Sequence, residues 1–181
     1  MRKVILAMNV SLDGYVAGPN GELDWIFRSM DPALGESVIS FLREVDTILI
    51  GHTTYLQQAA AWPKQTGEMA DLLNSHAKIV FASTLPTLEW NNSRLASSDA
   101  ATEIARLKQQ PGKTIFVTGG AMLAQSLSRL GLIDEYNLTI HPIVLGSGKP
   151  LFKDQSLPLT LKLVDSQAFA TGAVQLTYQK A

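Results

Sequence analysis

The chain has 181 residues, of which 46% are hydrophobic and 17% charged, and its formal net charge is −1 at pH 7. These values are ordinary for one globular domain, which we expect to span residues 1–181, and they supply no basic field for nucleic acid or an anionic membrane. The lack of cysteine excludes disulfides and thiolate metal sites and favours a cytoplasmic location. The apolar runs are too short for a signal peptide or for the ~18 residues of a membrane helix, so we expect neither.

Strands and helices alternate over the first two thirds of the chain. Apolar runs predict strands at residues 4–10, 46–51, 78–82, 94–96 and 114–118. Helical spacing and capping residues predict helices at about 32–45, 53–60, 67–75, 100–110 and 121–130. Asp31-Pro32 is typical of a helix start, with Asp as the cap and Pro at the first helical position. This alternation favours a parallel sheet with helical crossovers.

The last third of the chain alternates polar and apolar residues instead. Residues 135–141, 159–169 and 174–179 follow this pattern, and Thr171-Gly172 marks a turn between the last two. We expect all three segments to be antiparallel strands added to the sheet. The predicted fold class is therefore α/β, with a mixed, mostly parallel central sheet and helices on both faces.

The strand predicted at 114–118 ends in Gly119-Gly120, and a helical pattern begins at Ala121. Paired glycines permit a tight turn and let a ligand approach the backbone. Amides at the start of a helix are free donors that favour phosphate. The segment is thus either the floor of a site for a phosphorylated cofactor or a simple tight turn.

Two other strand ends carry small polar residues. Gly51-His52-Thr53-Thr54 leads from a strand into a helix, and Ser83-Thr84 follows the strand at 78–82. A glycine turn capped by threonine is the alternative interpretation of the first segment. Ligands of open α/β sheets bind outside the carboxyl ends of the strands, so three such ends favour one nucleotide site.

Other chemistries find little support. His52, His76 and His141 are far apart, with no carboxylate at ligand spacing, so we expect no metal site. No G-x-G-x-x-G follows a strand, and G-x-S-x-G is absent. Residues 146–150, Gly-Ser-Gly-Lys-Pro, lack the hydroxyl residue of a phosphate loop, which favours a loop between strands.

Together these segments resemble the dihydrofolate reductase superfamily and, more narrowly, stand-alone bacterial proteins related to the reductase domain of riboflavin biosynthesis. The resemblance covers nearly the whole chain. Residues 4–17 match the first strand and active-site loop, residues 48–55 and 117–121 match two turns, and residues 133–152 are the most specific match. The resemblance implies a three-layer fold and an NADPH-dependent oxidoreductase. Its substrate would be a small pterin- or pyrimidine-like heterocycle, as in dihydrofolate reductase or 5-amino-6-(5-phosphoribosylamino)uracil reductase.

The resemblance also implies roles for particular residues. Those expected to bind NADPH are Ala7, Gly14, Gly51, His52, Thr53, Thr54, Ser83, Thr84, Thr118, Gly119, Gly120, Ala121 and Met122. Those expected at the substrate are Asp13, Trp25 and Asp31. Candidate proton donors are Tyr15, Asp31 or a bound water. A cis bond between Gly119 and Gly120 is also expected.

Several alternatives stay open at this point. Asp13 is also a turn residue, Asp31 a helix cap, and Trp25 and Tyr15 packing residues. His52 stands where the family usually has Arg, which grips phosphate, so the preference for NADPH over NADH is open. A dinucleotide-binding sensor without turnover and an enzyme that binds no dinucleotide are alternative functions. The C-terminal strands leave an edge or apolar face, which makes a homodimer an expectation.

Overall fold

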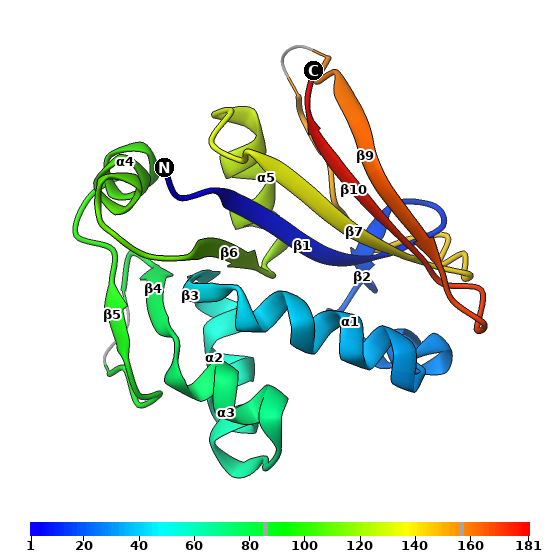
Figure 1. Ribbon diagram of the computed structural model, residues 1–181, viewed down its shortest axis with the longest axis horizontal. Helices are drawn as coiled ribbons and strands as arrows, with labels where there is room; N and C mark the ends of the chain where they lie inside the picture. Colours follow the sequence, from blue (N-terminus) through cyan, green and yellow to red (C-terminus); the bar gives the residue numbers. More distant parts are fainter. Residues whose placement is uncertain (85–86, 156–157) are drawn as a thin grey trace.

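An eight-stranded sheet runs through the described part of the computed structural model, residues 1–84, 87–155 and 158–181 (Figure 1). Its strands are β1 (Val4–Ser11), β3 (Val45–Gly51), β4 (Ala77–Phe81), β5 (Ser93–Leu95), β6 (Thr114–Thr118), β7 (Glu135–His141), β9 (Leu161–Ala168) and β10 (Val174–Lys180). Their order is β5-β4-β3-β6-β1-β7-β10-β9. The pairs from β5 to β7 are parallel, and those of β10 with β7 and β9 are antiparallel. The expected mixed, mostly parallel sheet is confirmed.

Helices cover both faces of the sheet, as expected, and give the molecule three layers (Figure 1). They are α1 (Pro32–Arg43), α2 (His52–Ala61), α3 (Glu68–Ser75), α4 (Ala100–Gln109) and α5 (Ala121–Arg129). Side chains of α1, α2 and α3 pack on one face, and side chains of α4 and α5 pack on the other. The 3-10 helices η1 (Asp24–Ser29) and η2 (Trp62–Lys64) and a ribbon of β2 (Tyr15–Ala17) and β8 (Lys149–Pro150) are additional to the expected elements.

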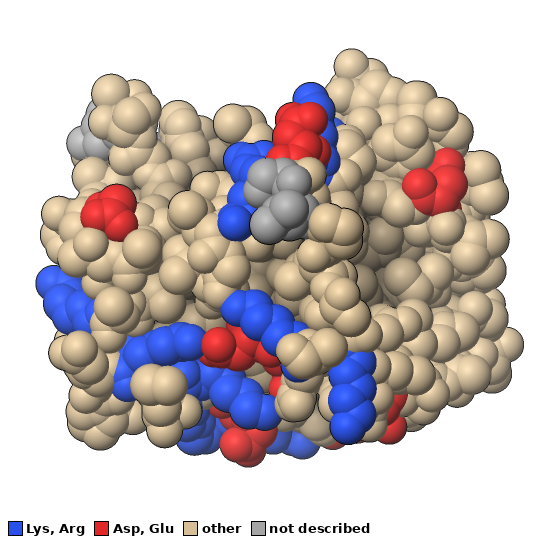
Figure 2. Space-filling model, turned by 90° about the horizontal axis from the view of Figure 1, so that it is seen from above, with Lys and Arg blue, Asp and Glu red and all other residues tan. Residues whose placement is uncertain are grey.

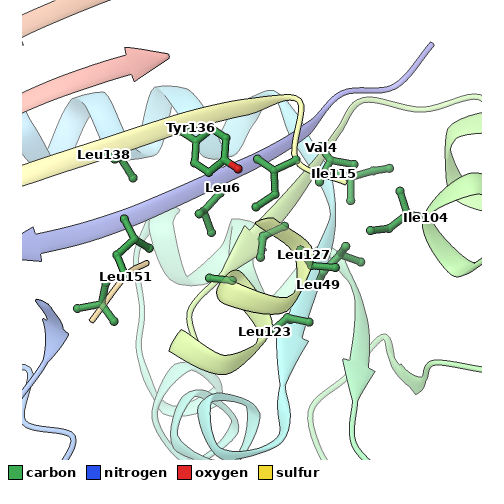
Figure 3. Close-up of a cluster of buried hydrophobic side chains, with 14 of the residues drawn as sticks. Val4, Leu6, Leu49, Ile104, Ile115, Leu123, Leu127, Tyr136, Leu138 and Leu151 are labelled. Atoms are coloured by element: carbon green, nitrogen blue, oxygen red, sulfur yellow. The ribbon is translucent and has the colours of Figure 1, made fainter. Parts of the chain in front are cut away.

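Alternation along the central strands sends neighbouring side chains into different cores. Ile48 and Ile50 of β3 join the cluster under α1 and α3, whereas Leu49 between them joins the cluster under α4 and α5. Figure 3 shows this second cluster, with Leu6 of β1 near Leu127 of α5. Burying a side chain of this size stabilises the fold by about 1.5–3 kcal/mol relative to leaving it exposed. The central strands are therefore held from both faces.

β7 pairs parallel with β1 and antiparallel with β10, so the expectation that it is an antiparallel strand is confirmed on the β10 side and wrong on the β1 side. Alternation of polar and apolar residues reports burial on one face and carries no information on strand direction. The direction of the strand follows from the connection before it. Helix α5 lies between β6 and β7 and carries the chain back to the end of the sheet at which the parallel strands begin. The expected hairpin is confirmed, since β9 and β10 are antiparallel and Gly172 between them has φ +86°.

Lysines and arginines lie among aspartates and glutamates on the face shown in Figure 2, and much of that face is uncharged. This mixture of signs agrees with the nearly balanced charges of the chain, whose formal net charge is −1. Within the described ranges, the helices are too short or too polar to pass through a membrane.

Candidate functional site

A cleft of about 720 Å³ opens at the carboxyl ends of β1, β3 and β6. The β2–β8 ribbon and the start of η1 form its opposite wall, through Val16, Leu23, Ile26, Lys149 and Pro150. Of the residues expected to bind the cofactor, those that line it are Ala7, Gly51, His52, Thr53, Thr54, Thr118, Gly119, Gly120, Ala121 and Met122. The two glycine-containing turns thus meet in one cleft, as their positions at strand ends require.

Two helices begin at this cleft with first-turn backbone amides that have no hydrogen-bond partner in the described part of the chain. Gly51 caps α2 and Gly120 caps α5, and neither helix has a side-chain cap or an acidic residue in its first turn. By contrast, Asp31 caps α1 by accepting from Leu34 N, and Asp99 caps α4 by accepting from Thr102 N. The first-turn amides of α2 and α5 are therefore free to bind an anion, and the positive ends of both helix dipoles are uncompensated.

The two turns touch each other closely. A Cβ on Gly119 would lie 2.9 Å from Thr54 Cγ2, and one on Gly120 would lie 3.3 Å from Thr54 Oγ1. Gly119 and Gly120 have φ of +57° and +86°, values that favour glycine. The bond between them is trans, so the expected cis bond was wrong. The two positive φ angles reverse the chain with an ordinary trans peptide.

Seven residues of the expected site do not line the cleft: Asp13, Gly14, Tyr15, Trp25, Asp31, Ser83 and Thr84. Ser83 and Thr84 are exposed beyond the end of β4, where Phe81 is the residue that reaches the cleft wall. Gly14 and Tyr15 belong to the ribbon wall: Gly14 O accepts from Leu151 N, and Tyr15 pairs with Pro150.

The side chains of Asp31, Trp25 and Asp13 are engaged within the fold. Asp31 Oδ1 accepts from Leu34 N at 2.8 Å, which is the geometry of a helix cap. Trp25 is buried, and its Nε1 donates to Glu22 O at 3.1 Å. Asp13 is exposed and accepts from Ser11 Oγ and from two backbone amides of the segment before β8. The Ser11 hydroxyl and these amides lower the pKa of Asp13.

Sequence reasoning missed several polar residues of the cleft wall: Asn9, Gln57, Gln58, Gln125, Lys149 and Lys153. Asn9 is two residues after Ala7 in β1 and so lies on the same face of the sheet, and Gln58 is one helical turn after Thr54. Those spacings are the signals that locate both residues. Gln58 Nε2 donates to Thr118 Oγ1 at 3.4 Å, whereas its buried Oε1 has no hydrogen-bond partner in the described chain.

Asn9 also belongs to a buried chain of hydrogen bonds. His141 Nε2 lies 2.8 Å from Asn9 Oδ1, and His141 Nδ1 lies 2.6 Å from Ser29 Oγ. Trp25 covers the imidazole edge-on, with 5.4 Å between the ring centroids. Burial lowers the pKa of His141, which keeps the ring neutral at pH 7.

A family model for the RibD C-terminal domain matches residues 2–175. The chain is also 39% identical to the uncharacterized protein YyaP of Bacillus subtilis (strain 168), over 98% of this chain and 94% of that protein. It is 32% identical to the uncharacterized protein YwjB of the same organism, over 99% of both chains.

Solved structures share the fold. A protein of Shewanella sp. PV-4 named for riboflavin biosynthesis has a TM-score of 0.80 and 25% identity over 99% of both chains. A deaminase/5-amino-6-(5-phosphoribosylamino)uracil reductase of Thermotoga maritima has a TM-score of 0.72 and 18% identity, over 99% of this chain and 57% of that one. Dihydrofolate reductase of Enterococcus faecalis, complexed with NADP(H), has a TM-score of 0.65 and 12% identity, over 98% of this chain and 96% of that one. The expected dihydrofolate reductase-like fold is confirmed.

Proposed function

This chain belongs to the RibD C-terminal domain family, and we propose that within this family of reductases it is an NADPH-dependent enzyme that reduces a small pterin- or pyrimidine-like heterocycle. The observation that carries the proposal is the meeting of two uncapped helix starts in one cleft. Such a pair suits a pyrophosphate, because each helix offers free amides and a positive dipole end to one phosphate.

The chemistry of the cleft fits NADPH in three further respects. The volume of about 720 Å³ is within the range of cofactor sites. The charged side chains of its described wall are Lys149 and Lys153, with no carboxylate among the lining residues, which favours a polyanionic ligand. The unpaired Oε1 of Gln58 is a buried acceptor that an N–H of a carboxamide would satisfy.

The residues of this chain would bind and orient the cofactor and the substrate, and they would exclude water from the cleft. The first-turn amides at Thr53-Thr54 and Ala121-Met122 would hold the phosphates, and the bare backbone of Gly119-Gly120 would allow close approach. Leu23 and Ile26 of the opposite wall would keep water from the reacting atoms. NADPH supplies a hydride when bound. Since the described residues of the wall include no carboxylate, and Tyr15 and Asp31 do not line it, we propose that a bound water delivers the proton.

The same lack of a carboxylate supports the second candidate function, a dinucleotide-binding sensor without turnover. Calorimetric titration with NADPH tests binding, and NADPH absorbance in the presence of pterin and pyrimidine acceptors tests turnover. Binding with oxidation by one acceptor class supports the reductase. Binding without oxidation by any acceptor supports the sensor, and no binding contradicts both.

A charge-matched pair of variants tests whether the binding is at this cleft. Gln58→Glu adds a carboxylate to the cleft wall, where it would repel an anionic cofactor, and is expected to weaken NADPH binding about tenfold or more. Gln65→Glu, at the exposed end of η2, adds the same charge outside the cleft and is expected to leave binding unchanged. Equal effects of the two substitutions would contradict the assignment of the site.

A further inference from the structure

Three elements that are distant in the chain meet at His141. The imidazole is fully buried at the end of β7, with Asn9 of β1 on its Nε2 and Ser29 of η1 on its Nδ1. Asn9 and His141 are separated by 132 residues in the chain, and Asn9 alone of the three lines the cleft. The catalytic steps described above make no use of this arrangement.

The direction of the two hydrogen bonds follows from the need to satisfy the buried groups. Asn9 Oδ1 only accepts, so His141 Nε2 carries the proton. The neutral ring then leaves Nδ1 as an acceptor for the hydroxyl of Ser29. In the reverse direction, the hydroxyl of Ser29, which is 5% exposed, would have no acceptor in the described part of the chain.

This direction determines what Asn9 offers to a ligand. Its Oδ1 is occupied by His141, so the amide cannot rotate by 180° without losing that bond. Its Nδ2 has no partner among the described residues and belongs to a residue of the cleft wall. Asn9 therefore presents a fixed N–H donor to the cleft, on the same face of β1 as Ala7.

We propose that Asn9 selects heterocycles that carry a ring carbonyl, by donating Nδ2–H to the carbonyl oxygen, and that His141 is the positioning residue that holds the amide in this orientation. The proposal rests on the proposed function, because it names the substrate class of the same cleft. A ring with an amino group at the corresponding position is rejected, since two donors would face each other and one would be left unpaired.

The substitution Asn9→Asp tests the donor directly. Aspartate has the shape of asparagine and can still accept from His141, but its free atom is an acceptor. The probes are pterin, with a 4-oxo group, and 2,4-diaminopteridine, with a 4-amino group. We expect the native protein to bind pterin about tenfold or more tightly than 2,4-diaminopteridine, and Asn9→Asp to reverse this preference. An unchanged preference in a folded Asn9→Asp protein would overturn the proposal.

Variants of the other two residues test the positioning role. Ser29→Ala removes the hydroxyl that donates to Nδ1, which frees the imidazole to change tautomer and the amide to flip. We expect the ratio of the affinities for pterin and 2,4-diaminopteridine to fall toward one. The effect on kcat should be smaller than the effect on the ratio of the two KM values. His141→Gln retains an N–H donor for Asn9 and is expected to retain more of the preference than His141→Phe. If His141→Phe does not fold, ¹⁵N NMR of the native imidazole decides: a protonated Nδ1 contradicts the proposed direction.

Titration with NADPH separates this inference from the proposed function. A protein that binds NADPH but shows no preference between the two pteridines contradicts the role of Asn9 alone. A protein that shows the preference and its reversal without binding NADPH retains the role of Asn9 and contradicts the reductase.

Discussion

Gly119 and Thr54 lie so close that the two turns of the cleft form one unit: a Cβ on Gly119 would stand 2.9 Å from Thr54 Cγ2. Gly119 also has φ +57°, which an L-residue adopts only with strain. The turn after β6 thus packs directly against the first turn of α2. This contact fixes the relative position of the N-termini of α2 and α5, which we propose to hold the phosphates.

Gly119→Ala is expected to lower the free energy of unfolding by about 2 kcal/mol or more, since strain and steric overlap add. Gly146→Ala is the control for strain alone, because Gly146 has φ +74° with nothing within 4 Å of a Cβ. Thr54→Ser removes the methyl group and is expected to relieve part of the loss in the double variant. Denaturant titration of the native protein, the three single variants and the double variant measures these effects. Equal losses of stability for Gly119→Ala and Gly146→Ala would contradict the steric overlap.

His52→Arg is expected to increase the preference for NADPH over NADH. His52 is exposed at the first position of α2 and lines the cleft, and Arg adds a permanent charge and a planar fork for a 2′-phosphate. At an exposed position we expect a gain of about three- to tenfold, decreasing with salt. The ratio of the two dissociation constants measures it, and an unchanged ratio would show that the 2′-phosphate does not reach this residue.

Asp31→Ala is expected to reduce stability without removing activity. The carboxylate caps α1 as Asp99 caps α4, so each substitution to Ala should cost about 1 kcal/mol. Thermal melts of the two variants compare the caps. Turnover with the best acceptor then tests chemistry: a loss of about a hundredfold in Asp31→Ala alone would restore Asp31 as a proton donor.

Lys78 gives the stability a pH dependence on the alkaline side. The side chain is fully buried, its Nζ donates to Asn74 O and Asn91 O, and burial lowers its pKa to about 8. Between pH 8 and the usual value of 10.5, the unfolded chain binds more protons than the folded one, so stability rises with pH. We expect a rise on the order of 1 kcal/mol in the native protein. Lys78→Met should abolish it, and Lys64→Met, at an exposed position, should not.

A homodimer stays a prediction, and β9 is the surface we propose for it. This edge strand exposes Leu163 and Val164 by 47% and 44%, and a second copy would cover them. Sedimentation of the native protein and of Val164→Lys measures the association. A monomeric native protein would contradict the expectation.

Local sequence patterns predicted the elements whose cause is local. The apolar run at 46–51 became β3 because it is buried on both faces, and Asp31-Pro32 begins α1 as capping rules require. The parallel pairing of β7 with β1 was not expected, because the direction of a strand depends on the connection before it and not on its residue pattern. η1 has no strong local signal; its Trp25 and Ser29 meet His141, more than a hundred residues later.

The same distinction applies to the cleft. Glycines at strand ends are visible in the sequence, so both turns were found, and the structure brings them together. The orientation of Asn9 was not foreseeable, since it depends on a partner 132 residues away. Ser83 and Thr84 were expected from the end of β4 but lie exposed beyond it, because the strand stops at Phe81.

One exposed carboxylate joins the two stretches of chain from which the ribbon wall is made. Asp13, in the turn before β2, accepts from Leu145 N at 3.1 Å and from Gly146 N at 2.8 Å in the stretch that leads to β8. The carboxylate thus adds to the backbone hydrogen bonds Leu12 N–Ile143 O and Leu151 N–Gly14 O, which join the same two stretches. Loss of this exposed carboxylate would therefore loosen the ribbon wall of the cleft without changing any residue that lines the cleft.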